Sequence, residues 1–180
     1  MIVKNEVLNN WINEMARMCN PDRIVWINGT EEEKEKLEKE ALDTGELFLL
    51  NQEKLPGCLL HRTALNDVAR TEKLTFICTA NQEEAGPTNN WMSPQDGYKK
   101  AGEFFKNSMT GRTMYAIPFS MGPVGSPFSK IGIELTDSIY VVLNMRIMTR
   151  IGDTVLESLG ENGEFTKCLH SKDDLEINRR

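Results

Sequence analysis

The sequence has 180 residues, of which 39% are apolar and 27% charged, and this composition suits one domain with a real core and argues against disorder. Its 21 basic and 27 acidic side chains leave a net charge of −6, so it is not expected to bind nucleic acid, which requires many basic contacts to phosphates. It has neither an apolar run of membrane-spanning length nor the apolar core of a signal peptide. Its four scattered cysteines indicate reduced thiols and a cytoplasmic protein.

The first thirty residues predict a helix followed by a short strand. Apolar side chains recur at helical spacing before Pro21, so we expect an amphipathic helix that this proline ends. Residues 23–27 are β-prone and lead into an Asn-Gly turn, which predicts a strand. The apolar positions of the helix are Val3, Val7, Leu8, Trp11, Ile12, Met15 and Met18.

A second helix is predicted to begin after Thr30. Thr30 and Glu33 have the spacing of a capping box, and Gly45 is the expected residue just past the end of the helix. Residues 31–40 hold six Glu and three Lys. Such a run is either a solvated helix face or an acidic docking surface, and we favour the solvated face because charge runs are usually exposed.

The middle of the chain predicts a strand, a loop and a third helix. Residues 75–79 read as a strand, whereas residues 81–90 are polar and contain Gly-Pro, which indicates a loop. Ser93 is an N-cap candidate directly before Pro94, so we expect a helix that runs toward Lys106.

Three further strands are predicted in the second half of the chain. Residues 112–119 read as a strand that meets Pro118, and residues 164–169 are a last short strand candidate. Residues 130–136 alternate, and the side chains on one face are those of Ile131, Ile133 and Leu135. These elements predict an α/β fold with a mixed sheet and flanking helices.

A helix capped by Asp137 or Ser138 is expected to continue through Arg150. It is apolar around most of its circumference, so we expect it to be largely buried. Arg146 and Arg150 would then share one face and repel each other, unless an anion lies between them. A bound phosphate or carboxylate would satisfy them, but an internal pair with Glu134 or Asp137 is the favoured interpretation.

Residues 107–137 form the most unusual segment, with four of the 13 glycines and three of the seven prolines. They form either a rigid loop around a ligand or a long connection between two buried strands, and the connection is favoured. Residues 98–150 carry seven cations and three anions. This local charge of +4 favours small anionic ligands.

Known catalytic motifs are absent from the sequence. It contains no phosphate-binding loop of the GxxxxGK[ST] type and no GxGxxG. Its two histidines are His61 and His170, and too few histidines are present for a Ser/His/Asp arrangement. Cys168 and His170 do not have metal-site spacing by themselves, so packing at an edge strand is the favoured role for both.

Arg70 is a candidate for binding a carboxylate. Its guanidinium group can make two parallel hydrogen bonds to such a ligand, and the small neighbour Ala69 leaves room for one. Pairing with Asp67 or Glu72 is the competing interpretation. The residues alone favour that pairing.

A longer pattern is more specific. From residue 111 to residue 152, with further matches on both sides, the chain strongly resembles GTP-dependent phosphoenolpyruvate carboxykinases. The matching motifs are DVAR (67–70), PTNNWM (87–92), GRTMY (111–115), PFSMGP (118–123), GSP (125–127), KIGIELTDS (130–138), MRIMTR (145–150), GEF (163–165) and KCLHS (167–171).

The resemblance implies a reaction and its cofactors. Members of this family convert oxaloacetate and GTP into phosphoenolpyruvate, carbon dioxide and GDP. Decarboxylation leaves an enolate, which receives the γ-phosphoryl group. The complete enzyme uses Mn²⁺ at the reacting oxygens and Mg²⁺ with GTP, roles that metals commonly take in phosphoryl transfer.

The resemblance also assigns roles to two residues. Arg70 matches the substrate-binding arginine of the family, which reverses the preference reached from the residues alone. Glu72 matches a loop residue that contacts the closing lid. The glycine- and proline-rich segment matches scaffold under the active site, so it is assigned no catalytic role. Because the family's metal ligands and nucleotide site have no match in this sequence, the chain is expected to hold no catalytic residue and no metal ligand.

The family's metal ligands, phosphate loop, guanine pocket and lid are not in this sequence. We therefore expect residues 1–180 to be the N-terminal, substrate-side domain. Its expected partners are the organic acid and a missing nucleotide-binding domain. Without that domain, we expect the chain to be inactive and prone to self-association. The alternative is a truncated, non-catalytic relative that binds dicarboxylates or proteins. The gene sequence past the codon for Arg180 discriminates the two.

Overall fold

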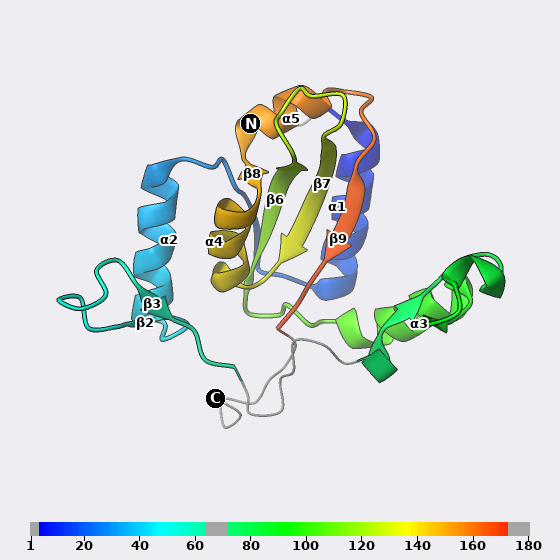
Figure 1. Cartoon of the computed structure of the whole chain (residues 1–180), viewed down its shortest axis with the longest axis horizontal. Coiled ribbons are helices and arrows are strands. Elements are labelled where there is room, and N and C mark those ends of the chain that lie inside the picture. The colour runs from blue at the N-terminus through cyan, green and yellow to red at the C-terminus, as the bar shows by residue number, and fades with distance from the viewer. Residues whose placement is uncertain (1–3, 64–71, 173–180) are drawn as a thin grey trace.

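The computed structural model describes residues 4–63 and 72–172. At its centre is a mixed sheet in the order β1-β6-β7-β9, with β8 also paired to β6 (Figure 1). Strand β1 is parallel to β6, and β9 is parallel to β7. Strand β6 is antiparallel to both β7 and β8. The expected mixed α/β fold is therefore confirmed. The strands are β1 (Arg23–Trp26), β6 (Thr113–Met121), β7 (Lys130–Thr136), β8 (Arg150–Ile151) and β9 (Thr166–Leu169).

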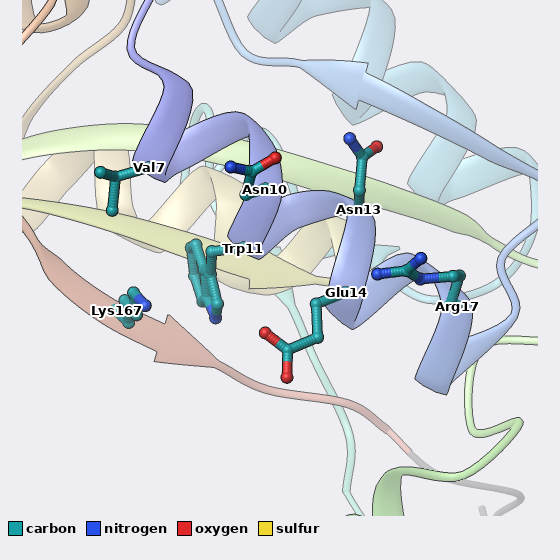
Figure 2. Close-up of a pocket in the computed structure, with 7 residues that line it drawn as sticks. All are labelled: Val7, Asn10, Trp11, Asn13, Glu14, Arg17 and Lys167. Atoms are coloured by element: carbon teal, nitrogen blue, oxygen red, sulfur yellow. The ribbon is translucent and has the colours of Figure 1, made fainter.

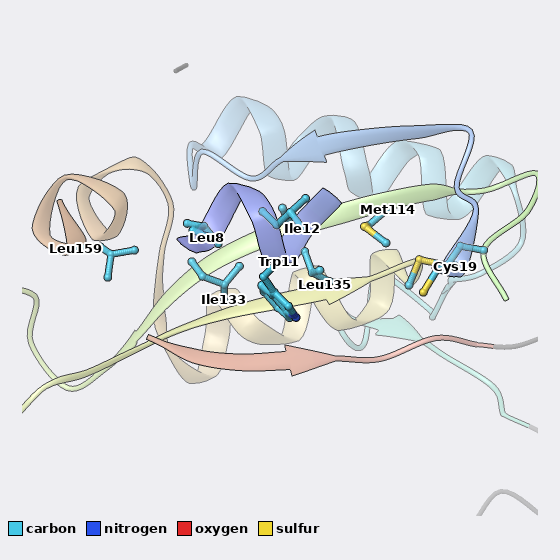
Figure 3. Close-up of a cluster of buried hydrophobic side chains, with 10 residues drawn as sticks. Leu8, Trp11, Ile12, Cys19, Met114, Ile133, Leu135 and Leu159 are labelled. Atoms are coloured by element: carbon cyan, nitrogen blue, oxygen red, sulfur yellow. The ribbon is translucent and has the colours of Figure 1, made fainter. Parts of the chain in front are cut away.

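Helix α1 (Glu6–Cys19) covers one face of the sheet. The Asn5 side chain caps it by accepting a hydrogen bond from the Leu8 amide at 3.0 Å. Ile133 and Leu135 project to this face because side chains alternate along β7. The amphipathic helix is confirmed from Leu8 onward, whereas Val7 is 63% exposed. The predicted apolar position Val3 lies outside the described residues. Figure 3 shows the cluster formed by Leu8, Trp11, Ile12, Cys19, Met109, Met114, Ala116, Ile133, Leu135 and Leu159.

Helices α2 (Glu31–Asp43) and α4 (Ile139–Met148) cover the opposite face. Thr30 caps α2 as expected, while the Glu33 carboxylate accepts hydrogen bonds from the Asn28 and Gly29 amides. The solvated face is confirmed as well, because only Leu37 and Ala41 of α2 are buried. The second apolar cluster contains Ile27, Leu37, Ala41, Leu47, Tyr115, Ile117, Ile139 and Val142.

Helix α4 differs from its prediction in length and burial. It ends at Met148, because Thr149 adopts extended backbone geometry and Arg150 pairs with Ser120 as part of β8. Only two of its residues are buried, and Ile147 is 83% exposed. A helix buries only the stripe that touches the sheet and its neighbouring helix, so apolar composition on every side did not make it a core helix.

The remaining elements are short. Four of the strands are two residues long: β2 and β3 pair antiparallel, and β4 and β5 pair parallel. In Figure 1 the β2–β3 pair and α3 extend to opposite sides of the sheet. The strand predicted at 75–79 is confirmed in shortened form, and so is the helix after Ser93. The elements are β2 (Phe48–Leu49), β3 (Leu59–Leu60), η1 (Glu72–Leu74), β4 (Phe76–Ile77), η2 (Gln82–Ala85), β5 (Asn90–Trp91), α3 (Pro94–Phe105) and α5 (Asp153–Leu159).

Two turns cross in close backbone contact beside the sheet. Gly29 follows β1 with φ +82°, and a Cβ atom there would lie 2.6 Å from the Ile151 carbonyl oxygen. Gly152 follows β8 with φ +101°, and its Cβ would lie 2.1 Å from the Asn28 carbonyl oxygen. Both positions therefore require glycine, for space as well as for backbone conformation.

Among the described residues, no helix has the length and apolar character needed to cross a membrane.

Candidate substrate-side site

Arg70 lies outside the described residues, but the chain is described on both sides of it. Glu72, the second candidate, begins η1 and is exposed. The Asn90 side chain on β5 fixes this end of the chain. Its Nδ2 donates to the Glu72 carbonyl oxygen at 2.6 Å and to the Thr75 carbonyl oxygen at 3.1 Å.

The side of the segment that precedes Arg70 is held by His61. Its ring stacks on Tyr140 of α4 with centroids 4.1 Å apart and planes 14° apart. Its Nδ1 lies 2.8 Å from the Glu46 carbonyl oxygen. Because a carbonyl only accepts, Nδ1 carries the hydrogen. Nothing in the spacing of the sequence indicated this contact, since the three residues come from separate parts of the chain.

Glu46 is itself fixed at the start of α4. Its carboxylate accepts hydrogen bonds from the Tyr140 amide at 2.9 Å and from Ser138 Oγ at 2.8 Å, and it forms an ion pair with Lys172 Nζ at 2.9 Å. Burial by itself would raise the pKa of Glu46. The hydrogen bonds from Tyr140, Lys172 and Ser138 and the charge of Lys172 together outweigh burial, so the pKa lies below its ordinary value.

A second carboxylate stands beside this group. Asp137 has a fully buried side chain, and it pairs with Arg112 Nε at 2.9 Å. It also accepts hydrogen bonds from Ser171 Oγ at 3.1 Å and from the Lys172 amide at 2.8 Å. Together, Glu46 and Asp137 tie the chain at residues 171–172 to the start of α4.

The predicted pair of arginines does not form a site. Arg150 lies on β8 rather than on the helix. Arg146 Nη2 donates to a carboxylate oxygen of Glu31 in α2 at 2.6 Å, so its partner is neither Glu134 nor Asp137 as expected. The partner was missed because α2 and α4 pack side by side, a tertiary contact that local spacing does not encode.

Glu134 and Cys168 are neighbours across β7 and β9. Burial raises the pKa of Glu134 to about 7. Burial also raises the pKa of the Cys168 thiol, and the charge of Glu134 adds to that shift. The thiol is thus not activated as a nucleophile. The predicted edge-strand role holds for Cys168, while His170 follows β9 and its Nδ1 lies 2.9 Å from Thr136 Oγ1.

The glycine- and proline-rich segment supplies β6 and the connection to β7. Its favoured interpretation as a link between two buried strands is confirmed. Pro118 is buried within β6, and its carbonyl oxygen accepts a hydrogen bond from the Gly152 amide at 3.0 Å.

Two open cavities run along α1 and involve neither Glu72 nor the residues that hold the segment around Arg70. The first, of about 510 Å³, lies between α1 and Lys167 (Figure 2). Lys167 Nζ stands 5.9 Å from the centre of the Trp11 ring. The second, of about 700 Å³, continues toward residues 161–165. Across residues 4–63 and 72–172, no three His, Cys, Asp or Glu side chains gather as a metal site.

Comparison with known proteins gives the family. The model for the phosphoenolpyruvate carboxykinase N-terminal domain matches residues 10–179. Phosphoenolpyruvate carboxykinases (GTP) from Anaeromyxobacter sp., Corynebacterium efficiens and Chlamydia trachomatis are 52%, 49% and 51% identical to this chain over 98%, 93% and 91% of its length. The aligned region spans only 30%, 27% and 27% of those relatives. The chain belongs to the family of phosphoenolpyruvate carboxykinase N-terminal domains.

Proposed function

We propose that this chain is the N-terminal, substrate-side part of a GTP-dependent phosphoenolpyruvate carboxykinase. The complete enzyme decarboxylates oxaloacetate and phosphorylates the resulting enolate from GTP, which yields phosphoenolpyruvate, carbon dioxide and GDP. The observation that carries this proposal is the match of 98% of the chain, at 52% identity, to a carboxykinase of which it spans 30%. Residues 1–180 form the substrate-side domain in this proposal, and the nucleotide-binding domain belongs to the rest of the enzyme.

Arg70 binds the carboxylate of the organic acid in this proposal. A guanidinium group offers two parallel N–H donors to a carboxylate, which a lysine cannot do. The match of DVAR (67–70) to the family supports the assignment. Glu72, exposed at the start of η1, is proposed to contact the closing lid.

Mn²⁺, Mg²⁺ and GTP are proposed to bind the rest of the enzyme. The proposed partner of the chain is that C-terminal, nucleotide-binding part. Exposed apolar side chains such as Phe128 (89%) and Ile147 (83%) support contact with it, and support self-association of the chain alone. We place the enzyme in the cytoplasm.

The test is Arg70→Ala in the complete enzyme that carries these 180 residues. Losing hydrogen bonds between charged groups should raise the KM for oxaloacetate by about 10- to 100-fold. The KM for GTP should stay within about twofold, because the change removes a contact to the acid alone. Arg62→Ala, at an exposed arginine nearby, is the control. An unchanged KM for oxaloacetate would contradict the assignment.

The isolated chain should have no turnover. Formation of phosphoenolpyruvate by the purified 180 residues with GTP and Mn²⁺ would contradict this expectation. Titration calorimetry with phosphoenolpyruvate should detect binding of millimolar strength at best, or about −4 kcal/mol.

A further inference from the structure

We propose that the C-terminal part of the enzyme covers the face of β7 and β9 opposite α1 and places a basic side chain against Glu134. The inference rests on the proposed function, because it takes this chain to be the N-terminal part of a longer carboxykinase. It adds which surface the remainder of the enzyme occupies and which charge it meets there. The surface consists of Glu134, Thr166 and Cys168 with the Phe119 ring beside them, and is called the β7–β9 face.

Strand pairing places these side chains on one side of the sheet. Ile133 and Leu135 of β7 point toward α1, so Glu134 between them points to the opposite side. Glu134 is paired with Cys168 of β9, and paired residues share a side. Thr166 stands two residues before Cys168 and therefore lies on the same side.

The helices of the described chain leave the β7–β9 face uncovered. The apolar cluster beneath α2 and α4 contains side chains of β1, β6 and β8, but none of β7 or β9. In Figure 1, α2 and α4 lie beyond β6, on the side of the sheet away from β9. Thr166 is exposed, while Glu134 and Cys168 are half-buried. Sheets in α/β proteins pack against another layer, so this part of the sheet lacks one.

Glu134 has no partner for its charge among the described residues, where no group donates a hydrogen bond to its carboxyl and no cation pairs with it. Ile117 and Cys168 lie opposite it on the neighbouring strands. The Phe119 ring covers Gly132 nearby, where a Cβ atom would lie 2.4 Å from the ring. Burial among these groups raises the pKa of Glu134 to about 7. A cation that reaches this carboxylate would offset the cost of its burial.

The relatives indicate what occupies the face. The chain spans only 30% and 27% of the Anaeromyxobacter and Corynebacterium carboxykinases, so most of each relative lies outside the matched region. Strand β9 is an edge strand, and the described chain runs on from it to residue 172. In the complete enzyme, the segments that follow therefore start beside this face and need only a short connection to cover it. A second copy of the chain is the competing occupant.

The experiment measures labelling of a thiol by a maleimide in the complete enzyme, with Thr166→Cys and, separately, Lys167→Cys. Both positions are exposed neighbours in β9, but Lys167 lies on the α1 side, over the Trp11 ring. Tandem mass spectrometry locates the label. Thr166→Cys should react about 100 times more slowly than Lys167→Cys, because a packed interface excludes the reagent. Equal rates, or slower labelling of Lys167→Cys, would overturn the inference.

Charge reversal tests for the basic side chain. Glu134→Lys places like charges together, so labelling of Thr166→Cys should become about tenfold faster as the covering part is released. Glu134→Gln keeps the shape without the charge and should accelerate labelling about threefold. The control Glu157→Lys makes the same charge change at an exposed side chain of α5 and should leave the rate within about twofold. Unchanged labelling in both Glu134 variants would overturn the basic partner.

Two further measurements identify the occupant. Labelling of Thr166→Cys that slows as the enzyme concentration rises would show a second copy on this face, and would overturn the inference. A rate independent of concentration supports the C-terminal part of the same chain. Turnover of oxaloacetate with GTP tests the proposed function separately, because an inactive complete enzyme that retains the labelling contrast would defeat the function and leave the covered face standing.

Discussion

The sheet with α1 and α4 is held together differently from residues 46–63 and 72–106. In the sheet, six of the nine residues of β6 are buried, and both faces carry apolar clusters. Within residues 46–63 and 72–106 the strands are two residues long, and large apolar side chains such as Leu49 (61%) and Leu74 (71%) are exposed. Side-chain hydrogen bonds to the backbone, from residues such as Gln52, Asn90 and Trp91, shape this region.

The two regions should contribute unequally to the free energy of unfolding, and candidate residue Glu72 lies in the one that contributes less. Apolar burial contributes about 1.5–3 kcal/mol for each fully buried large side chain, whereas a single hydrogen bond contributes about 0.5–1.5 kcal/mol. The sheet should therefore dominate the free energy of unfolding. Glu72 lies in the weakly held region.

The largest expected effect is a cavity in the sheet. Ile133 is fully buried between β6 and α1. Ile133→Ala should lower the free energy of unfolding by about 3–4 kcal/mol, through lost burial and the cavity left behind. Leu74→Ala, at a 71% exposed side chain, should change it by less than about 0.5 kcal/mol. Urea denaturation of the 180-residue chain measures both free energies of unfolding. Similar losses for the two variants would show that the sheet does not dominate stability.

The ion pair at the start of α4 should come second. Arg112→Met leaves the fully buried Asp137 carboxylate without its cationic partner. Because the Arg112 side chain is 29% exposed and solvent screens the pair, the loss should be about 2 kcal/mol, below the range for fully buried pairs. Lys4→Met, at the exposed pair with Glu161, is the control. Equal stability of Arg112→Met and wild type in urea would refute the role of this pair.

Glu134 provides a test by pH. Its pKa is raised on folding from 4.5 to about 7, so its contribution to stability is present below pH 4.5 and is lost as the pH rises to about 7. Glu134→Gln cannot ionise and should avoid that loss. Partial exposure reduces the expected difference to roughly 1–2 kcal/mol in favour of the variant at pH 8 relative to pH 4.5.

The measurement is the free energy of unfolding of both proteins between pH 4.5 and pH 8. Glu46 does not interfere, because its pKa is lowered and its contribution is lost only as the pH falls below 4.5. A constant difference between the two proteins across this range would show that folding leaves the Glu134 carboxyl unperturbed.

The smallest expected effect concerns the turn that the Gln52 side chain holds between β2 and β3. Gln52 donates to the carbonyl oxygens of Leu50 and Cys58 and accepts from the Gly57 amide. Gln52→Ala should open this turn locally, with hydrogen exchange at the Gly57 amide about tenfold faster, yet change global stability by less than about 0.5 kcal/mol. A global loss comparable to that of Ile133→Ala would mean that the turn unfolds together with the sheet.

The sequence predicted the elements that have local signals. The helix start at Thr30, the N-cap at Ser93 and the alternation in β7 each depend on neighbouring residues, and each was confirmed. Of the expected capping box only the hydrogen bond to the Thr30 side chain formed, because the Glu33 carboxylate accepts from amides that precede Thr30. The errors concern contacts between distant residues. Arg146 pairs with Glu31 across two helices, and a periodic pattern does not show which side of a helix another element will cover.

The candidate site was predictable only in part. The motifs between residues 111 and 152, extended by matches such as DVAR (67–70), identified the family, which the comparisons confirm. Arg70 and Glu72 retain their roles as proposals. The contacts of His61 were not predictable, because Glu46, His61 and Tyr140 meet only once α4 has packed on the sheet. Asn90 belongs to a recognised motif, yet its two hydrogen bonds depend on the parallel pairing of β4 and β5.

The crossing of the two glycine turns constrains how this fold can diverge. With the Asn28 carbonyl oxygen 2.1 Å from where a Gly152 side chain would start, neither turn can gain a methyl group unless the other withdraws. The connections after β1 and after β8 lie more than a hundred residues apart in the chain, yet an insertion in one would have to be matched by a compensating change in the other.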